Sequence, residues 1–486
     1  MTDLSRLSPD MQDAVFSQMI TRRSFIRRSS AAALAAAGLS ALPGSLMAAS
    51  DLDRPRKPTL IVVYLRGGAD PLNTLVPFSD PLYATLRPTV AVGPPRDGDP
   101  NAALPLTNQF GLHPAMKPLL PYFLAGKVAP ILNVGSPHHS RSHFDAQDFM
   151  ERAAPGIRTI TDGWLNRYLQ ATKQPNDPEL RAISLQPLLP RSLRGEYPVL
   201  AAPGHGSEQA MAAFEDLYES GAMSLPLPGQ HAEAQMGAGD MEGEMSRREA
   251  EIARRRAEVA ARKLRLSGKA LPEITGEDAR RSIVSAGDNT IRRLREYQSI
   301  VAARDGSRAA YPDRSWFGGR LHDVAKLIKS NRGLEMAALD YGGWDHHAYM
   351  GGPEGQMARM LGDVSASLAA FMADLGDLMD QTLILVMSEF GRTVAENGNN
   401  GTDHGRGGMM LAMGNMVNGN RMYGKWTGLE SKQLADGRDL PVHTDFRLVF
   451  AEALFRLFKF DAITTDDFFP GYRQRNKPLN FMNQVG

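Results

Sequence analysis

The chain has 486 residues, of which 42% are hydrophobic and 22% charged, as in ordinary soluble globular enzymes. Its 55 basic and 54 acidic residues leave a formal net charge of +1, which gives no support for nucleic-acid binding or for a polybasic membrane surface. Because the chain has no cysteine, the sequence excludes disulfides, thiolate metal sites, iron–sulfur clusters and cysteine nucleophiles. Any metal ion would therefore bind histidine, carboxylate, hydroxyl or carbonyl groups.

The N-terminal segment has the pattern of an export signal. Arg22 and Arg23 lie in "TRRSFIRR", which precedes 22 uncharged residues, and this resembles a twin-arginine signal peptide comprising residues 1–49. A retained membrane anchor is the alternative, since 22 residues can span a bilayer. The stretch is mostly Ala, Ser and Gly and contains Pro43-Gly44, so no stable anchor is expected. The sequence predicts a periplasmic or secreted protein that the twin-arginine export machinery transports.

Four apolar runs predict strands of a parallel sheet. The first run comprises residues 60–65, and the others lie within residues 127–135, 333–347 and 381–393. Each run ends at Gly, Ser or Asp, and polar groups follow. Residues 354–381 have helical spacing and connect the third run to the fourth as a βαβ unit. The fold class we expect is α/β: a doubly wound, mostly parallel sheet flanked by helices.

The middle of the chain has a different composition. Residues 226–243 have the composition of a loop, and residues 241–270, rich in Glu, Arg and Ala, predict a long helix exposed to solvent. A nucleic-acid-binding arm is disfavoured because acidic residues alternate with the basic ones. We expect a mostly helical insertion at 206–332, and one α/β domain formed by residues 50–205 and 333–486.

The segment "GGWDHH" (342–347) is the first candidate site. On an extended backbone Asp345 and His347 face the same side, so they could bind one ion, whereas His346 would face away. A polar turn with surface histidines is the alternative. Asp70 lies beyond the glycine turn after the first strand, where functional groups of such sheets gather.

Two further candidates follow the fourth strand. Glu389 ends an apolar run and is either a ligand or the partner of Arg392 in a salt bridge. Asp403 and His404 lie in the glycine-rich "NGNNGTDHGRGG" and form either a ligand pair or an ordinary polar loop. Arg406 could bind an anionic oxygen.

The segment "SPHHSRSHFDAQDFME" (136–151) follows the second strand. Ser140 or Ser142 could act as a metal-activated nucleophile, or could simply cap a helix that begins there. His143 could move protons or bind metal.

Several motifs together resemble a known family. They include "LRGGADPLNTLVP", "SRSHFDAQDFME", "DYGGWDHH", "SEFGRT" and "GTDHGRGG". The combination is similar to the bacterial family catalogued as domain of unknown function 1501, which is placed in the alkaline phosphatase-like (sulfatase-like) superfamily. The resemblance implies a doubly wound α/β fold, a site for one or two divalent ions and a hydroxyl nucleophile.

Residue by residue, the resemblance implies metal ligands among the candidates named above. They are Asp70, Asp345, His347, Glu389, Asp403 and His404, with zinc, manganese, magnesium or calcium as the ion. Ser142 is the better nucleophile, ahead of Ser140, with His143 and Arg406 as catalytic groups. Ser388-Glu389 replaces the superfamily's usual Asp-His, so the second metal would be bound differently or be absent.

The expected function is that of an exported, metal-dependent hydrolase of phosphate or sulfate esters, which uses serine or hydroxide as the nucleophile. Its substrate would be a small-molecule or glycan ester. The alternative is a non-catalytic secreted binding or assembly protein on the same fold. The two differ in whether the candidate side chains meet in one open pocket.

Overall fold

The computed structural model describes residues 56–186, 188–202, 276–304, 306–464, 468–472 and 477–483. The predicted signal peptide (1–49), the loop at 226–243 and the solvated helix at 241–270 lie outside these residues. The chain divides into two compact units, Met1–Gly204 with Leu294–Gly486, and His205–Arg293. In the second unit the described residues form the first part of α9 (Gly276–Ala302). All that follows concerns the first unit.

The first unit is built on an eight-stranded sheet with the order β11-β5-β10-β9-β1-β8-β6-β7. Strand β10 pairs antiparallel with both β5 and β9, whereas every other neighbouring pair is parallel. All strands except β10 therefore end at the same edge. The strands are β1 (Thr59–Arg66), β5 (Val128–Gly135), β6 (Ala182–Ser184), β7 (Leu200–Ala201), β8 (Met336–Gly342), β9 (Thr382–Met387), β10 (Gly408–Met413) and β11 (Thr444–Asp445).

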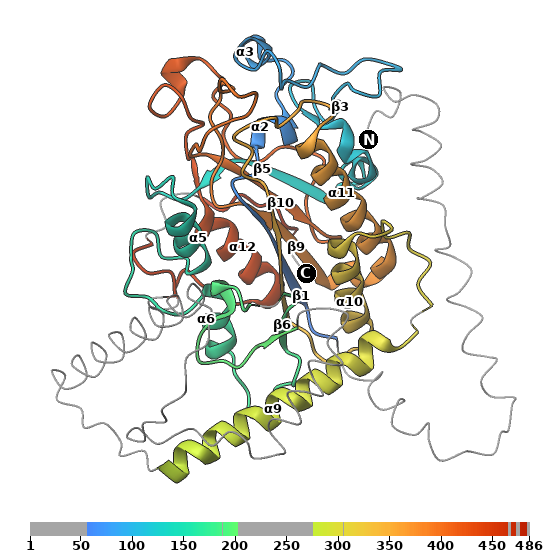
Figure 1. Ribbon diagram of the computed structural model, residues 1–486, viewed down its shortest axis with the longest axis vertical. Coiled ribbons are helices and arrows are strands. Elements are labelled where there is room, and N and C mark those ends of the chain that lie inside the picture. The colour runs from blue at the N-terminus through green and yellow to red at the C-terminus, as the bar shows by residue number, and fades with distance from the viewer. Residues whose placement is uncertain are drawn as a thin grey trace, which may run out of the picture. The chain divides into compact units, whose positions relative to one another are not determined.

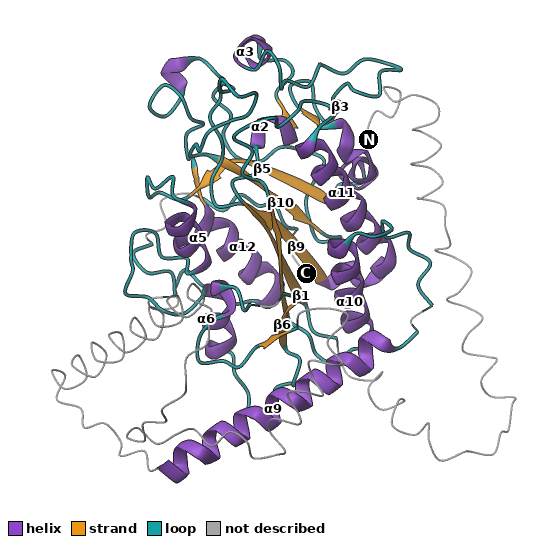
Figure 2. Cartoon of the chain, viewed as in Figure 1, coloured by secondary structure: helices purple, strands orange, loops and turns teal. Residues whose placement is uncertain are grey.

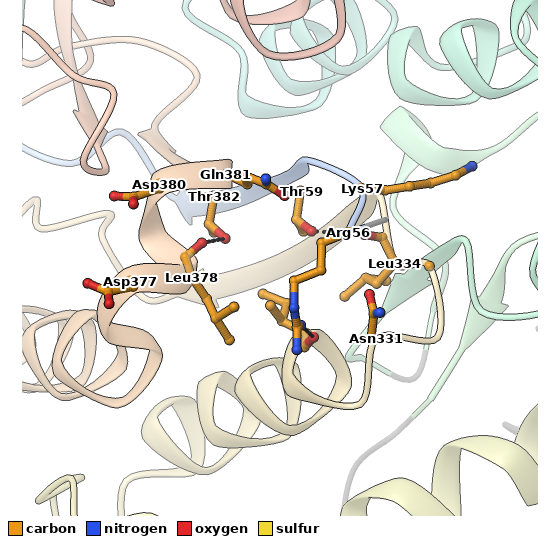
Figure 3. A pocket seen from close by; sticks show the side chains of 12 residues that line it. Arg56, Lys57, Thr59, Asn331, Leu334, Asp377, Leu378, Asp380, Gln381 and Thr382 are labelled. Atoms are coloured by element: carbon orange, nitrogen blue, oxygen red, sulfur yellow. Dashed lines mark hydrogen bonds between the residues drawn. The ribbon is translucent and has the colours of Figure 1, made fainter. Parts of the chain in front are cut away.

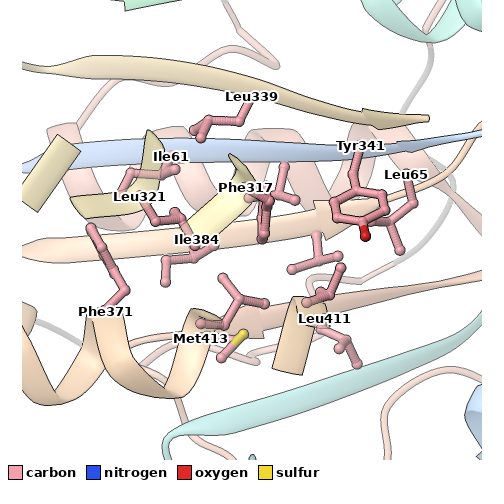
Figure 4. Packing of buried hydrophobic residues seen from close by; sticks show 14 of the residues in the cluster. Ile61, Leu65, Phe317, Leu321, Leu339, Tyr341, Phe371, Ile384, Leu411 and Met413 are labelled. Atoms are coloured by element: carbon pink, nitrogen blue, oxygen red, sulfur yellow. The ribbon is translucent and has the colours of Figure 1, made fainter. Parts of the chain in front are cut away.

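Helices cover both faces of this sheet (Figures 1 and 2). On one face lie α10 (Trp316–Lys329) and α11 (Gln356–Leu375), and on the other lie α6 (Trp164–Ala171) and α12 (Phe446–Phe458). Side chains of β1 alternate between two buried clusters, because successive residues of a strand face opposite sides. Ile61 and Leu65 belong to the cluster under α10 and α11, which Figure 4 shows. This three-layer arrangement confirms the predicted α/β fold.

The predicted strands are confirmed in position, with two differences in length. Strand β8 ends at Gly342 and strand β9 at Met387, so the polar residues that follow belong to loops. Helix α11 joins β8 to β9 as the crossover of a βαβ unit, and β1 lies between these two parallel strands. Strands β6 and β10 were not among the predicted strands, and the apolar runs did not predict the reversed direction of β10.

Helix α10 lies within the predicted insertion, residues 206–332, yet it packs against α11 in the first unit.

The described elements that have not yet been named are short. A three-stranded sheet, β2-β4-β3, stands apart from the main sheet. The short elements are α2 (Pro71–Thr74), β2 (Leu75–Val76), α3 (Pro81–Leu86), β3 (Leu104–Pro105), β4 (Gly111–Leu112), η2 (Pro114–Leu119), α4 (Leu120–Leu124), α5 (His143–Glu151), η3 (Arg191–Leu193), η4 (Gly376–Gln381) and η5 (Ser431–Gln433).

Within the described residues, no helix combines the length and the apolarity needed to cross a bilayer.

Candidate metal centre

The direction of the strands brings polar residues from distant parts of the sequence to one edge of the sheet. His143 follows β5, and Asp345 and His347 follow β8, so all three lie beyond carboxyl ends. His404 precedes β10, and because β10 runs in the opposite direction its amino end lies at the same edge. This edge is where α/β proteins place their ligands.

Four side chains meet there, and we call them the His/Asp cluster: His143, Asp345, His347 and His404. Ligand atoms of His143, Asp345 and His404 lie within 4.8 Å of one another, a spacing that could hold a metal ion. The Nε2 atoms of His347 and His404 are each 3.0 Å from Asp345 Oδ1 and 2.9 Å from each other. His143 Nε2 is 3.3 Å from Asp345 Oδ2. The cluster is open to solvent, since the Asp345 side chain is 43% exposed.

Each histidine of the cluster is oriented by an oxygen atom that contacts its Nδ1. A carbonyl or carboxylate oxygen only accepts, so we assign the proton of each neutral ring to Nδ1, which leaves the Nε2 lone pair directed into the cluster. The pairs and their N–O distances are His143 with Glu389 Oε1 (2.7 Å), His347 with Asp403 Oδ1 (2.9 Å) and His404 with the Arg141 carbonyl (2.8 Å).

This assignment leaves acceptor atoms facing one another. Two Nε2 lone pairs and a carboxylate oxygen lie about 3 Å apart with no proton between them, and such groups repel unless a cation lies among them. The buried Nε2 of His143 likewise has no hydrogen-bond partner. Two ligands that are each about 2.0–2.1 Å from one ion lie about 3 Å apart when the angle between them is near 90°. The residues therefore fit a divalent metal ion.

The electrostatics of the cluster also favour a cation. Burial alone would raise the pKa of Asp345. The hydrogen bond and charge of Arg392, together with the hydrogen bond from His404, outweigh burial and lower the pKa to about 2. Asp345 is therefore ionised at neutral pH. Burial lowers the pKa of His404, which favours the neutral ring that metal binding needs. The hydrogen bond to Glu389 raises the pKa of His143, so this negative environment stabilises positive charge at its ring.

Glu389 and Asp403 occupy positions outside the cluster rather than in it. The buried Glu389 Oε1 accepts from His143 Nδ1, from Gln147 Nε2 at 2.8 Å and from the Gly67 amide at 2.9 Å. Burial raises the pKa of Glu389, but the hydrogen bonds from His143 and Gln147 lower it overall. Both residues were predicted as metal ligands, whereas their observed contacts orient histidine rings. In turn, His143, predicted as a catalytic group, takes a position in the cluster.

The fully buried Arg392 holds the loops around the cluster together. Its guanidinium donates to Asp345 Oδ1 at 2.5 Å and to the carbonyls of Gly68 at 2.7 Å and Thr402 at 2.8 Å. It thus links the loops after β1 and β8 to the loop before β10. The salt bridge between Arg392 and Glu389, considered from the sequence, is not what forms, because the acidic partner of Arg392 is Asp345.

Two glycines allow these loops to approach closely. Gly67 has a φ of +123°, and a Cβ there would lie 2.6 Å from the Asp345 amide nitrogen. A Cβ at Gly401 would lie 2.4 Å from the carbonyl carbon of His347. Real Cβ atoms do not come this close to backbone, so a side chain at either position would displace a cluster residue.

The structure gives Asp70 a different role from that of a metal ligand. Its Oδ1 caps α2 by accepting from the Leu72 and Asn73 amides, and it pairs with the buried Arg87 at 2.8 Å. Its Oδ2 accepts from Thr402. With both oxygens engaged in the interior, Asp70 does not join the His/Asp cluster, and we leave it out of the proposed metal site.

The predicted nucleophile, Ser142, and the predicted anion-binding residue, Arg406, have different surroundings. Ser142 is exposed at the N-cap position of α5, next to His143, and its hydroxyl does not cap the helix. Arg406 lines a cavity of about 790 Å³ together with His138, and the described lining of that cavity includes no residue of the His/Asp cluster. Ser142 thus directly precedes a cluster residue in the chain, whereas Arg406 lines a separate cavity.

A further cavity, shown in Figure 3, lies at the opposite edge of the sheet. Its lining includes Thr59 and Thr382, the first residues of β1 and β9, together with Asp377 and Asp380. No residue proposed for function lies there, so it does not bear on the cluster.

A family model described as "Protein of unknown function (DUF1501)" matches residues 100–462. No curated protein and no solved structure matches the chain.

Proposed function

The chain belongs to the DUF1501 family of proteins of unknown function, and from this premise and the His/Asp cluster we propose that it is a metal-dependent hydrolase of phosphate or sulfate esters. One observation carries the proposal. Histidines from three different loops turn their Nε2 atoms toward one ionised carboxylate, and the Nε2 atoms of His347 and His404 are only 2.9 Å apart. The mostly parallel sheet with this cluster at its functional edge supports a place in the alkaline phosphatase-like superfamily.

The donor set indicates which ion the cluster would hold. Three imidazoles and one carboxylate suit zinc or manganese better than magnesium or calcium, which prefer oxygen ligands. Within the described residues one group, His143, Asp345 and His404, has the spacing of a metal site, and His347 adjoins it through Asp345 and His404. Asp70 is paired with Arg87, so we propose a single ion. When bound, the ion would polarise an ester oxygen and stabilise negative charge in the transition state.

The chain itself would position the reacting groups. The amide groups at the N-terminus of α5 favour an anionic ester oxygen near Ser142. Ser142 Oγ would bond to the phosphorus or sulfur atom as the bond to the alcohol oxygen breaks, and the hydroxyl proton balances the one that the alcohol gains. Water would then cleave the seryl ester. Arg392 holds Asp345 in place throughout, because its guanidinium is fixed by backbone carbonyls.

We also propose that the protein acts outside the cytoplasm. The segment containing Arg22 and Arg23 supports export by the twin-arginine pathway, which carries proteins that have already folded. A chain without cysteine is suited to an oxidising compartment.

Hydrolysis of a panel of phosphate and sulfate esters by the metal-loaded protein tests the function. We expect Ser142→Ala to lower kcat by about 10³-fold or more with unchanged metal content, and Ser140→Ala to change it only slightly. Unchanged turnover in Ser142→Ala would assign the attack to water instead of serine. Absence of hydrolysis across the panel would contradict the hydrolase and favour the binding or assembly protein.

A further inference from the structure

A cavity of about 450 Å³ lies beside the His/Asp cluster, at the carboxyl ends of β1 and β8. One face of α5 lines it with Phe144, Gln147 and Glu151, and the segment 188–191 after β6 forms the facing wall. Its size is that of ordinary small-molecule sites, which range from about 300 to 1,000 Å³. The crevice beyond the carboxyl ends of the strands is where α/β sheets bind ligands.

Gln147 connects this cavity to the cluster. Its Nε2 donates to Glu389 Oε1 at 2.8 Å, the same oxygen that contacts His143 Nδ1, and its Oε1 accepts from Arg66 at 3.1 Å. Phe144 directly follows His143 in the chain. A molecule in the cavity would therefore lie one side chain away from the groups that orient the cluster.

The mouth of the cavity exposes apolar side chains. Phe144 is 83% exposed and Leu188 is 76% exposed, and both line the cavity with Leu189 and Pro190. Leaving an aromatic and an aliphatic side chain of this size in water forgoes the free energy of their burial. Apolar surface that gathers at a cavity, instead of being scattered, marks a binding site.

The charges around the cavity are largely compensated. Arg66 pairs with Asp340 at 2.5 Å and with Glu151 at 3.1 Å. Arg191 pairs with Asp148 at 2.5 Å. An anion would have to compete with these carboxylates, whereas an uncharged apolar group would meet Phe144 and the leucines without disturbing an ion pair.

We propose that this cavity binds the alcohol portion of the ester, and that this portion is an uncharged aromatic or similarly apolar group. That the bound group is part of an ester rests on the proposed function, whereas the binding site itself is inferred from the cavity and its lining. The scissile group would lie at the His/Asp cluster, and the apolar group would contact Phe144 and Leu188. Arg194, whose Nε donates to the Leu189 carbonyl, lies at the rim and can bind polar edges of that group.

Equilibrium binding of 2-naphthol, an uncharged aromatic alcohol, tests the site without requiring turnover. We expect binding to the wild type, and binding about tenfold weaker in Phe144→Ser and in Leu188→Ser. Both side chains are exposed, so serine removes little packing, and unchanged metal content would verify that the neighbouring cluster is intact. Phe455→Ser, which removes an exposed phenylalanine of α12, should bind as the wild type does. No binding by the wild type, or equal binding by all variants, would overturn the proposal.

Hydrolysis of 2-(2-naphthyl)ethyl and ethyl esters, whose alcohols are similar leaving groups, separates this proposal from the proposed function. If both hold, kcat/KM is higher for the naphthylethyl ester, and Phe144→Ser removes that preference. If 2-naphthol binding depends on Phe144 but no ester is hydrolysed, the site is supported and the hydrolase is contradicted. If both esters are hydrolysed equally and Phe144→Ser changes nothing, the hydrolase is supported and the site is overturned.

Discussion

Each histidine of the His/Asp cluster is fixed by one oxygen atom on the far side of its ring. Such partners set the tautomer and orientation of a metal-binding histidine, and their loss commonly lowers metal affinity by about 10–100-fold. Glu389 is buried, and its hydrogen bond is the main cause of the raised pKa of His143. A proton on His143 Nε2 competes with the metal ion, so metal affinity should depend on pH.

Glu389→Gln tests this competition. In the wild type, metal affinity should fall as the pH decreases, beginning above about 6.5, the ordinary pKa of histidine, because His143 takes up a proton early. The glutamine retains an acceptor oxygen but removes the charge, so the pKa of His143 falls and the decrease moves to lower pH. Titrations with zinc at several pH values measure the midpoint, and the affinity at high pH should also be lower.

The matched control is Asp377→Asn, which removes a carboxylate at the opposite edge of the sheet. Its pH curve should coincide with that of the wild type. Identical midpoints for Glu389→Gln and the wild type would contradict the assigned role of Glu389.

For individual residues, the sequence pattern correctly predicted the relative orientation of Asp345 and His347 in the segment after β8. The alternation of an extended backbone predicted that Asp345 and His347 face one side, and their ligand atoms lie 3.0 Å apart, whereas His346 is buried. For Glu389 and Asp403 the pattern could not distinguish a ligand from a residue that orients one. That distinction depends on which side of a ring an oxygen reaches, which only the packed loops determine.

Among the elements, the loop after β1 shows how a strand-end acid can serve structure instead of chemistry. Asp70 caps α2, and its partner Arg87 is fully buried. Burial raises the pKa of Asp70, but Arg87 and the capping amides lower it overall, so the acid is ionised when folded. Removing one partner of such a pair leaves the other charge uncompensated in the interior.

Asp70→Asn should therefore lower the free energy of unfolding by about 3–5 kcal/mol while the protein retains its metal ion. Chemical denaturation and elemental analysis of the same sample measure the two effects. Asp80→Asn is the matched control, because Asp80 caps the neighbouring α3 without a buried ion pair, and it should cost less than about 1 kcal/mol. Loss of metal at unchanged stability would instead make Asp70 a ligand.

Individual strands also show which parts of the fold the sequence could predict and which it could not. The apolar runs of β1, β5, β8 and β9 located the central strands, because a strand buried on both faces is apolar throughout. The direction of β10 could not be read in this way, since the pairing of "GMMLAM" with β5 and β9 depends on neighbours distant in sequence. Yet this reversal is what brings His404 to the cluster.

For the molecule as a whole, the proposal combines a site at the sheet edge with export in the folded state. A metal ion loaded before transport would cross the membrane with its protein. The N-terminal "TRRSFIRR" supplies two arginine pairs, of which Arg22 and Arg23 have the position expected for the signal.

Replacing Arg22 and Arg23 by lysine should prevent export, because the twin-arginine machinery requires this pair and charge alone does not satisfy it. Cell fractionation should then find the variant in the cytoplasm with its N-terminal segment uncleaved. Lysine at Arg27 and Arg28 provides a control of equal charge and should leave export largely unchanged. Export of the first variant at the wild-type level would rule out this pathway.

The central claim is that His143, Asp345, His347 and His404 hold one divalent ion, and the metal content of the purified protein tests it most directly. Elemental analysis by mass spectrometry, after equilibration with zinc and manganese and removal of free ions, should find about one ion per chain in the wild type. Asp345→Asn, similar in size and without the charge, should contain almost none. A wild type without stoichiometric metal, or equal metal content in Asp345→Asn, would contradict the account.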